Sequence, residues 1–154
     1  MAARSFSESI DLEVPCRYAF DFLADPTTAT VIDPAVREYR PDSVPMGEGT
    51  KTVVRFAIWG LPVRAVSVVT HWEPGVRMVM ESVRPSRPVR VVATHRFEPA
   101  GDDRCTYVWA IDFVPVGPFG SIAARILARF MCSNAKAQEA RLKAETERRW
   151  ALDR

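Results

Sequence analysis

Hydrophobic and polar residues alternate at the start of the chain with a period of two, which is typical of a half-buried β-strand. In residues 6–14 every second side chain is apolar except Glu8, which shares the inner face. Pro15 ends this strand, and apolar residues then recur at helical spacing until the Asp25-Pro26 pair. Residues 27–32, which a second Asp-Pro pair follows, indicate another short helix.

Six further segments alternate in the same way, and residues typical of turns separate them. These predicted strands cover residues 35–40, 50–58, 62–72, 77–82, 90–99 and 105–113. Because short turns join most successive strands, an antiparallel sheet is expected. Both faces of the 62–72 segment are apolar, so its register stays open.

A helical pattern begins only after the last strand. The helix is predicted to run from Phe119 to about Arg149, with Ile122, Ile126 and Phe130 on its apolar face. We expect this helix to lie across the concave face of the sheet, with Ile126 and Phe130 largely buried. The order of elements therefore predicts an α+β fold, a curved seven-stranded antiparallel sheet around a C-terminal helix, with a cavity between them.

Charged residues make up 26% of the 154 residues and hydrophobic residues 47%, which is the balance of a globular protein and fits a single domain over 1–154. The net charge is only +2 and basic residues are mixed with acidic ones, which argues against nucleic acid as a partner. On the long helix, Glu139 precedes Lys143 by four positions, a spacing typical of solvated ion pairs. Arg84, Arg87 and Arg90 crowd one proline-containing loop, which is either simply solvated or a gate for an acidic ligand or carrier partner.

Localisation and redox state follow from two further features. Residues 1–9 lack the apolar stretch of a secretory leader and no 18 apolar residues run together, which indicates a cytoplasmic protein without stable membrane insertion. Cys16, Cys105 and Cys132 are far apart and have no histidine at metal-ligand spacing, so reduced core thiols are expected, and neither a metal nor a cofactor. A homodimer stays open.

Turn and packing residues carry a resemblance that spans nearly the whole chain. They are Ile10-x-Leu12-x-Val14-Pro15, Ala19-Phe20-x-Phe22-Leu23-Ala24-Asp25-Pro26, Asp33-Pro34, Gly47-x-Gly49-Thr50, Trp72-x-Pro74 and the helix start at Gly117. With these motifs the chain resembles the START-like (SRPBCC) superfamily of polyketide cyclase/dehydrase and lipid-transport type. The resemblance implies the helix-grip fold and a hydrophobic pocket, but its members include cyclases, carriers and ligand sensors.

Few residues offer chemistry for a catalytic site. The only histidines are His71 and His95, and motifs of metal or serine hydrolases are absent. His95 shares a strand face with Phe97 and is expected to neighbour Tyr107 or Trp109 on the next strand. His95 and Tyr107 are therefore candidate acid/base groups, while a core histidine bonded to Tyr107 is the alternative.

Two main functions follow, and a third stays open. The first is binding of a small hydrophobic ligand, a lipid or polyketide-like molecule, in the internal cavity. Its predicted ligand-binding residues are Val54, Phe56, Met78, Met80, His95, Phe97, Trp109, Ile122, Ile126 and Phe130. The second is a polyketide cyclase or dehydratase that uses His95 and Tyr107. An interaction module, whose pocket would be filled by its own side chains, is the third.

Overall fold

A computed structural model describes residues 4–154 and has the predicted α+β architecture. Residues 1–3, which belong to the 1–9 segment used for the localisation prediction, lie outside this range. The strands are β1 (Arg4–Leu12), β2 (Val36–Pro41), β3 (Lys51–Ile58), β4 (Leu61–Glu73), β5 (Arg77–Arg84), β6 (Val89–Gly101) and β7 (Arg104–Pro115). The helices are α1 (Cys16–Ala24), α2 (Ala29–Ile32) and α3 (Gly120–Asp153). The predicted boundaries differ from these by a few residues.

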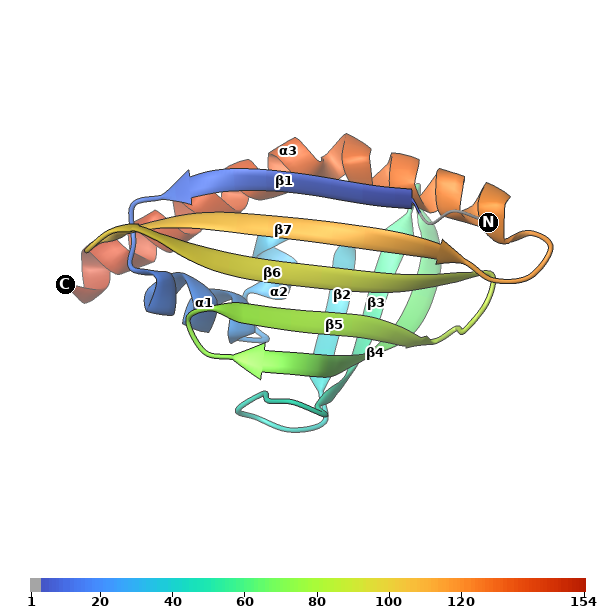
Figure 1. Cartoon of the computed structure of the whole chain (residues 1–154), viewed down its shortest axis with the longest axis horizontal. Helices are drawn as coiled ribbons and strands as arrows, with labels where there is room; N and C mark the ends of the chain where they lie inside the picture. The colour runs from blue at the N-terminus through green and yellow to red at the C-terminus, as the bar shows by residue number, and fades with distance from the viewer. Residues whose placement is uncertain (1–3) are drawn as a thin grey trace.

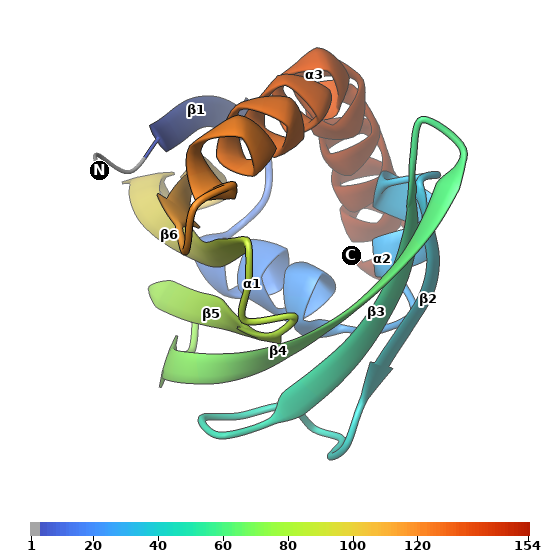
Figure 2. The same ribbon diagram turned by 90° about the vertical axis from the view of Figure 1, so that its right-hand side faces the viewer.

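All seven strands belong to one antiparallel sheet, in the order β1-β7-β6-β5-β4-β3-β2. The sheet curls strongly, α3 crosses its concave side, and α1 and α2 lie toward one end (Figures 1 and 2). The register of β4, which the sequence left open, pairs Ser67 with Ser82 of β5. As a result, Val63, Ala65 and Ser67 face the interior.

The core forms where the inner face of the sheet meets α1 and α3. Alternate residues of β7, from Cys105 to Phe113, are all buried, as the period of two predicts. From α1, Phe20 contacts the rings of Trp72 and Phe97 edge-on, with centroids 5.0 and 5.4 Å away. This packing closes one end of the curled sheet.

The prediction that Ile126 is largely buried is wrong, because its exposed fraction is 47%, whereas Phe130 is buried at 9%. Small residues face the sheet in the first turns of α3 instead: Ala124 is fully buried and Gly120 lies against the loop before β6. A Cβ atom on Gly120 would come within 2.9 Å of the carbonyl oxygen of Pro88. We infer that this close approach sets the rotation of α3 that turns Ile126 outward.

The three cysteines differ in environment, so the expectation of three core thiols is correct only in part. Cys105 is buried, Cys16 is half-buried and Cys132 is exposed, and all three are free thiols. Burial raises the pKa of the Cys105 thiol, and the neighbouring Cys16 adds to the rise. Cys105 is therefore a neutral packing residue.

Candidate functional site: an apolar cavity with a polar floor

A main cavity of about 340 Å³ lies between the concave face of the sheet and α3. Two adjoining compartments, of about 280 and 220 Å³, share the lining residues Ser82 and Val91 with it, so the three cavities lie next to one another along the sheet. The walls of the main cavity are largely aliphatic and aromatic. Its apolar lining comprises Leu23, Ile32, Val36, Val54, Met80, Val91, Ala93, Trp109, Ile111, Met131 and Leu142.

One polar pair stands on the wall that β6 and β7 form. The Nδ1 atom of His95 lies 2.6 Å from the hydroxyl oxygen of Tyr107, and the two rings are stacked with centroids 5.9 Å apart. The strand register places His95 opposite Trp109, so Tyr107 is the diagonal neighbour. Burial lowers the pKa of His95 to about 4, and the imidazole is therefore neutral at pH 7.

A carboxylate from α3 lies close to this polar pair, and we call the three groups the polar floor of the cavity. Glu139 accepts a hydrogen bond of 3.1 Å from the indole Nε1 of Trp109 and lines the main cavity. The prediction of a solvated pair between Glu139 and Lys143 is wrong, because Lys143 pairs with Glu147 and donates to the carbonyl oxygen of Asp11. Burial raises the pKa of the Tyr107 hydroxyl, and the charge of Glu139 adds to the rise. Tyr107 is thus a neutral hydroxyl.

Two further sets of polar groups reach the cavity. Gln138 donates from Nε2 to the carboxylate of Asp33 over 2.9 Å, which ties α3 to the turn after α2. On the opposite wall Ser67 and Ser82 are cross-strand partners, and the hydroxyl oxygen of Ser82 accepts a bond of 2.7 Å from the backbone N–H of Val91. The hydroxyl hydrogen of Ser82 is thereby left for another acceptor.

The structure divides the residues that the sequence suggested for ligand binding into three groups. Those that line the main cavity are Val54, Met80, His95 and Trp109. Those that line the adjoining compartments are Phe56, Ile126 and Phe130. Those that do not line any of the three are Met78 and Phe97, both buried in the core, and Ile122, which is 61% exposed. Ile122 stands outside because the same rotation of α3 that exposes Ile126 turns it away from the sheet.

Sequence reasoning missed five polar residues of the cavity: Tyr39, Ser67, Ser82, Gln138 and Glu139. Lys143 follows Glu139 by four positions, which is the spacing of an ion pair on a helix surface. The sequence around Glu139 therefore gave no signal of burial. Ser67 could have been found once the β4 register was known. Residues 4–154 hold no cluster of three or more histidine, cysteine, aspartate or glutamate side chains able to bind a metal.

The curled antiparallel sheet, the crossing C-terminal helix and the apolar cavity between them define a helix-grip protein. A family model described as polyketide cyclase / dehydrase and lipid transport matches residues 3–147. The chain therefore belongs to this START-like family, whose members bind ligands or cyclise polyketides. A comparison with curated protein sequences gives no match.

Several solved structures share the fold at low sequence identity. The Zhui aromatase/cyclase from Streptomyces sp. R1128 is 17% identical with a TM-score of 0.82, and the match covers 96% of each chain. A START superfamily protein from Mycobacterium smegmatis is 12% identical with a TM-score of 0.67, over 91% of this chain and 97% of that one. Norcoclaurine synthase from Thalictrum flavum, in complex with dopamine and hydroxybenzaldehyde, is 10% identical with a TM-score of 0.70, over 93% and 86%. Within residues 4–154, no helix is long and apolar enough to span a bilayer.

Proposed function

We propose that the protein binds a small, mainly apolar molecule that carries oxygen atoms, a lipid or a polyketide-like compound, in the main cavity. The observation that carries the proposal is a hollow with aliphatic and aromatic walls and a small number of polar groups, among them His95, Tyr107 and Glu139. Apolar walls stabilise the bound molecule by about 25 cal/mol per Å² removed from water, while the few polar groups orient it. The free thiols are compatible with a cytoplasmic location, which we also propose.

A cyclase or dehydratase is the second candidate, and the 2.6 Å contact between His95 and Tyr107 is what favours it. The pKa of His95, about 4, weighs against it. An efficient general base has a pKa near the working pH, and protonating this imidazole at pH 7 costs about 4 kcal/mol. Binding without catalysis is therefore the better-supported function.

The cavity can be tested with an anilinonaphthalene sulfonate probe and a substitution that fills it. Ala93 lies on β6, between β5 and β7, and lines the main cavity. Ala93→Trp should therefore weaken binding of the probe by roughly tenfold or more, about 1.4 kcal/mol. Arg96→Trp is the matched control, because Arg96 is exposed on the opposite face of the same strand. Fluorescence titration gives the affinities, and circular dichroism checks that both variants fold. Equal affinities for the two variants would refute binding in the cavity.

A second substitution separates binding from catalysis. His95→Gln keeps a donor and an acceptor but cannot exchange a proton near neutral pH. If a polyketide substrate is turned over, general acid/base catalysis by His95 predicts a loss of roughly 10²-fold or more in kcat. Full turnover by His95→Gln would exclude this role, and binding without turnover by the unsubstituted protein would support a carrier.

A further inference from the structure

The large hydrophobic side chains that stay exposed gather at one end of the molecule. We call this the open end and define it as residues 58–64, 83–90 and 115–129. Of the ten large hydrophobic residues exposed within residues 4–154, six belong to it: Trp59, Leu61, Val83, Phe119, Ile122 and Ile126. The most exposed are Phe119 at 73%, Leu61 at 69% and Trp59 at 62%. Scattered exposed apolar residues are ordinary in a monomer, but a gathered group marks an interaction surface.

The three segments of the open end border the end of the curled sheet that Figure 2 faces. The ring of Trp59, at the tip of the β3–β4 hairpin, contacts Phe130 of α3 edge-on with centroids 5.5 Å apart. Ile58, Pro85 and Ile126, one from each segment, line the same compartment of about 280 Å³. The open end therefore borders a compartment that adjoins the main cavity, and we call this border the mouth of the hollow.

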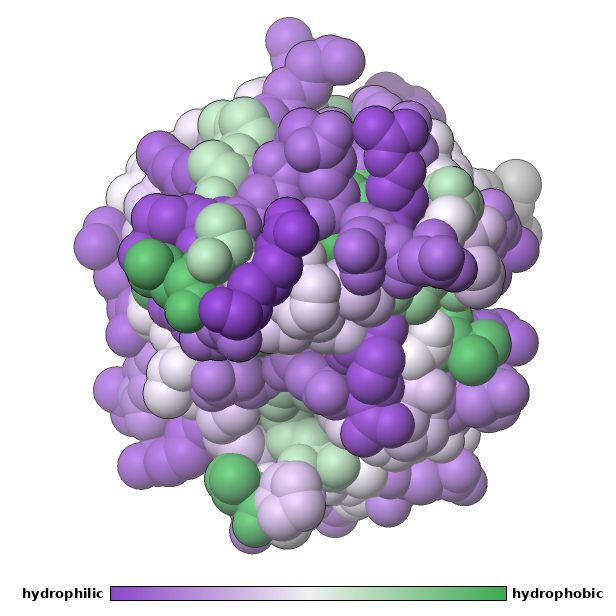
Figure 3. All heavy atoms as spheres, turned by 90° about the vertical axis from the view of Figure 1, so that its left-hand side faces the viewer, coloured by the Kyte–Doolittle hydropathy of each residue, from purple (hydrophilic) through white to green (hydrophobic). Residues whose placement is uncertain are grey.

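The charge of the open end is entirely positive. Its segments contain six arginines and not a single aspartate or glutamate. Within the described chain only Arg90 of these six has an ion pair, 3.2 Å from Glu81, while Arg64, Arg84, Arg87, Arg125 and Arg129 have none. Since the net charge of the protein is only +2, the remainder of the chain is negative overall. The opposite end, shown in Figure 3, is mostly hydrophilic with scattered apolar residues.

Cationic and apolar side chains also alternate on the exposed side of α3. Ile122, Arg125, Ile126 and Arg129 follow the spacing i, i+3, i+4, i+7, and all four are exposed. These positions form one face of a helix. Long arginine side chains beside large aliphatic residues can place their charged heads at lipid phosphates while the aliphatic side chains enter the interfacial layer.

We propose that the open end docks reversibly on a membrane surface that carries anionic lipids. The apolar side chains enter the interfacial layer, and the unpaired arginines contact lipid phosphates. A fluid surface suits this end because its most exposed apolar side chains come from separate segments rather than from one shaped groove. Docking there places the mouth of the hollow against the bilayer. That an apolar ligand then passes between lipid and cavity rests on the proposed function, but the docking itself does not.

Vesicle co-sedimentation of the full chain tests the docking without any ligand. The protein should bind vesicles made of equal parts phosphatidylcholine and phosphatidylglycerol and not vesicles of phosphatidylcholine alone, and added salt should weaken the binding. Arg125→Gln with Arg129→Gln should weaken it about fivefold for each arginine. Ile122→Ser with Ile126→Ser should also weaken it, while the charge of the surface is unchanged.

Two matched controls lie on the far half of α3. Arg141→Gln removes an exposed arginine roughly 20 Å along the helix from the open end, and Leu152→Ser removes a side chain that is 71% exposed. Both should bind like the unsubstituted protein. The proposal is overturned if the protein binds neither kind of vesicle or binds both kinds equally. It is also overturned if the control variants lose as much binding as the test variants. Dimers in light scattering that Ile122→Ser abolishes, without vesicle binding, would also overturn it and assign the surface to a second copy.

Discussion

The two halves of α3 belong to one continuous helix but are built differently. The first half, residues 120–138, contains no acidic residue, whereas the second half, residues 139–153, contains Glu139, Glu145, Glu147 and Asp153. Buried residues of the first half are mainly small, such as Ala124 and Ala135, and its large side chains Ile122 and Ile126 are exposed.

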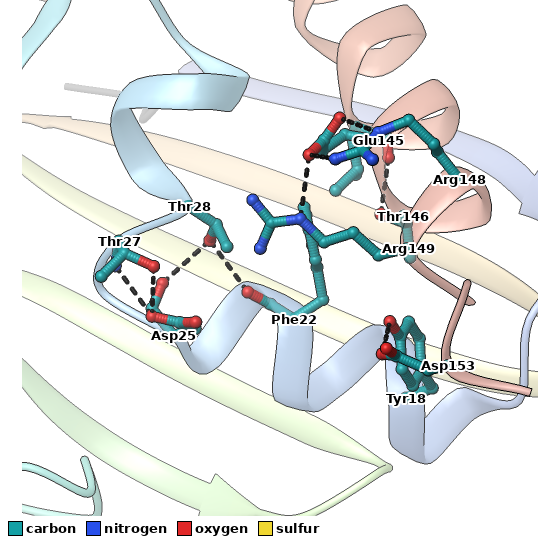
Figure 4. Close-up of polar contacts among 11 residues, drawn as sticks. Tyr18, Phe22, Asp25, Thr27, Thr28, Glu145, Thr146, Arg148, Arg149 and Asp153 are labelled. Atoms are coloured by element: carbon teal, nitrogen blue, oxygen red, sulfur yellow. Dashed lines mark hydrogen bonds and ion pairs between the residues drawn. The ribbon is translucent and has the colours of Figure 1, made fainter. Parts of the chain in front are cut away.

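The second half is tied to the rest of the protein by many polar and aromatic contacts. The guanidinium of Arg149 lies 5.1 Å from the centre of the Phe22 ring of α1 (Figure 4). Within the helix, Glu145 pairs with Arg148 and Arg149, which hold the pKa of its carboxyl at about 2. Tyr18 of α1 donates to Asp153 over 2.7 Å, and burial together with that carboxylate raises the pKa of Tyr18 to about 12.

This difference shows how one helix can serve two purposes. The second half fastens the helix to α1 and to the end of β1, because Glu147 also accepts a hydrogen bond of 3.0 Å from the backbone N–H of Glu13. The first half rests on the sheet with few large buried side chains, which leaves the hollow open and apolar surface exposed. Glu139, the first residue of the second half, stands where the fastened half meets the cavity.

The largest expected effect on stability comes from truncating a buried side chain in the second, fastened half of α3. Leu142 is 4% exposed and belongs to the core, so Leu142→Ala should lower the free energy of unfolding by about 2–5 kcal/mol. Ile122→Ala, the same kind of truncation in the first half, should change it by only about 0.5 kcal/mol or less. Urea unfolding of both variants measures the contrast. Equal losses would contradict the division of α3 into a fastened and a lightly packed half.

Local periodicity explains which parts of the molecule could be predicted from the sequence. The strands, the order of elements and the inner face of β7 follow from a period of two. The same alternation placed His95 and Tyr107 on the same face of neighbouring strands, which predicted that they would be neighbours. The rotation of α3 could not be predicted in this way. It depends on the close approach of Gly120 to Pro88 and Pro115, a tertiary contact that leaves no periodic trace. With the rotation wrong, Ile122 and Ile126 were expected inside. Glu139 was expected outside because Lys143 follows it by four positions.

A pH-dependent loss of stability should arise at His95 of β6, which lines the same cavity as Glu139. Its folded pKa of about 4 lies below the ordinary value of 6.5, so the unfolded chain binds the proton first as the pH falls. Its contribution is therefore complete above pH 6.5 and is lost as the pH falls to 4, with about 2 kcal/mol lost at pH 5. His95→Gln should remove this part of the slope. Parallel slopes of the two proteins between pH 7 and pH 5, measured by urea unfolding, would contradict the burial of a neutral imidazole.

The smallest expected effect concerns the contact that orients the first half. In Gly120→Ala the new Cβ would lie 2.9 Å from backbone atoms of Pro115 and Pro88, which can move only together with the loop before β6. Overpacking of this kind costs about 1–3 kcal/mol, and the better helix propensity of alanine offsets up to about 1 kcal/mol of it, so a net loss of about 1 kcal/mol is expected.

Gly47→Ala is the control for Gly120→Ala, because nothing lies within 4 Å of a Cβ there and the backbone does not adopt a positive φ. The change should be neutral or should stabilise the folded protein by about 0.5 kcal/mol, because alanine reduces the conformational entropy of the unfolded chain. Thermal unfolding of both variants gives the difference. If Gly120→Ala is as stable as Gly47→Ala, the loop yields easily and the close approach does not fix the rotation of α3. The outward position of Ile122 and Ile126 would then need another cause, and their exposure would be easier to reverse.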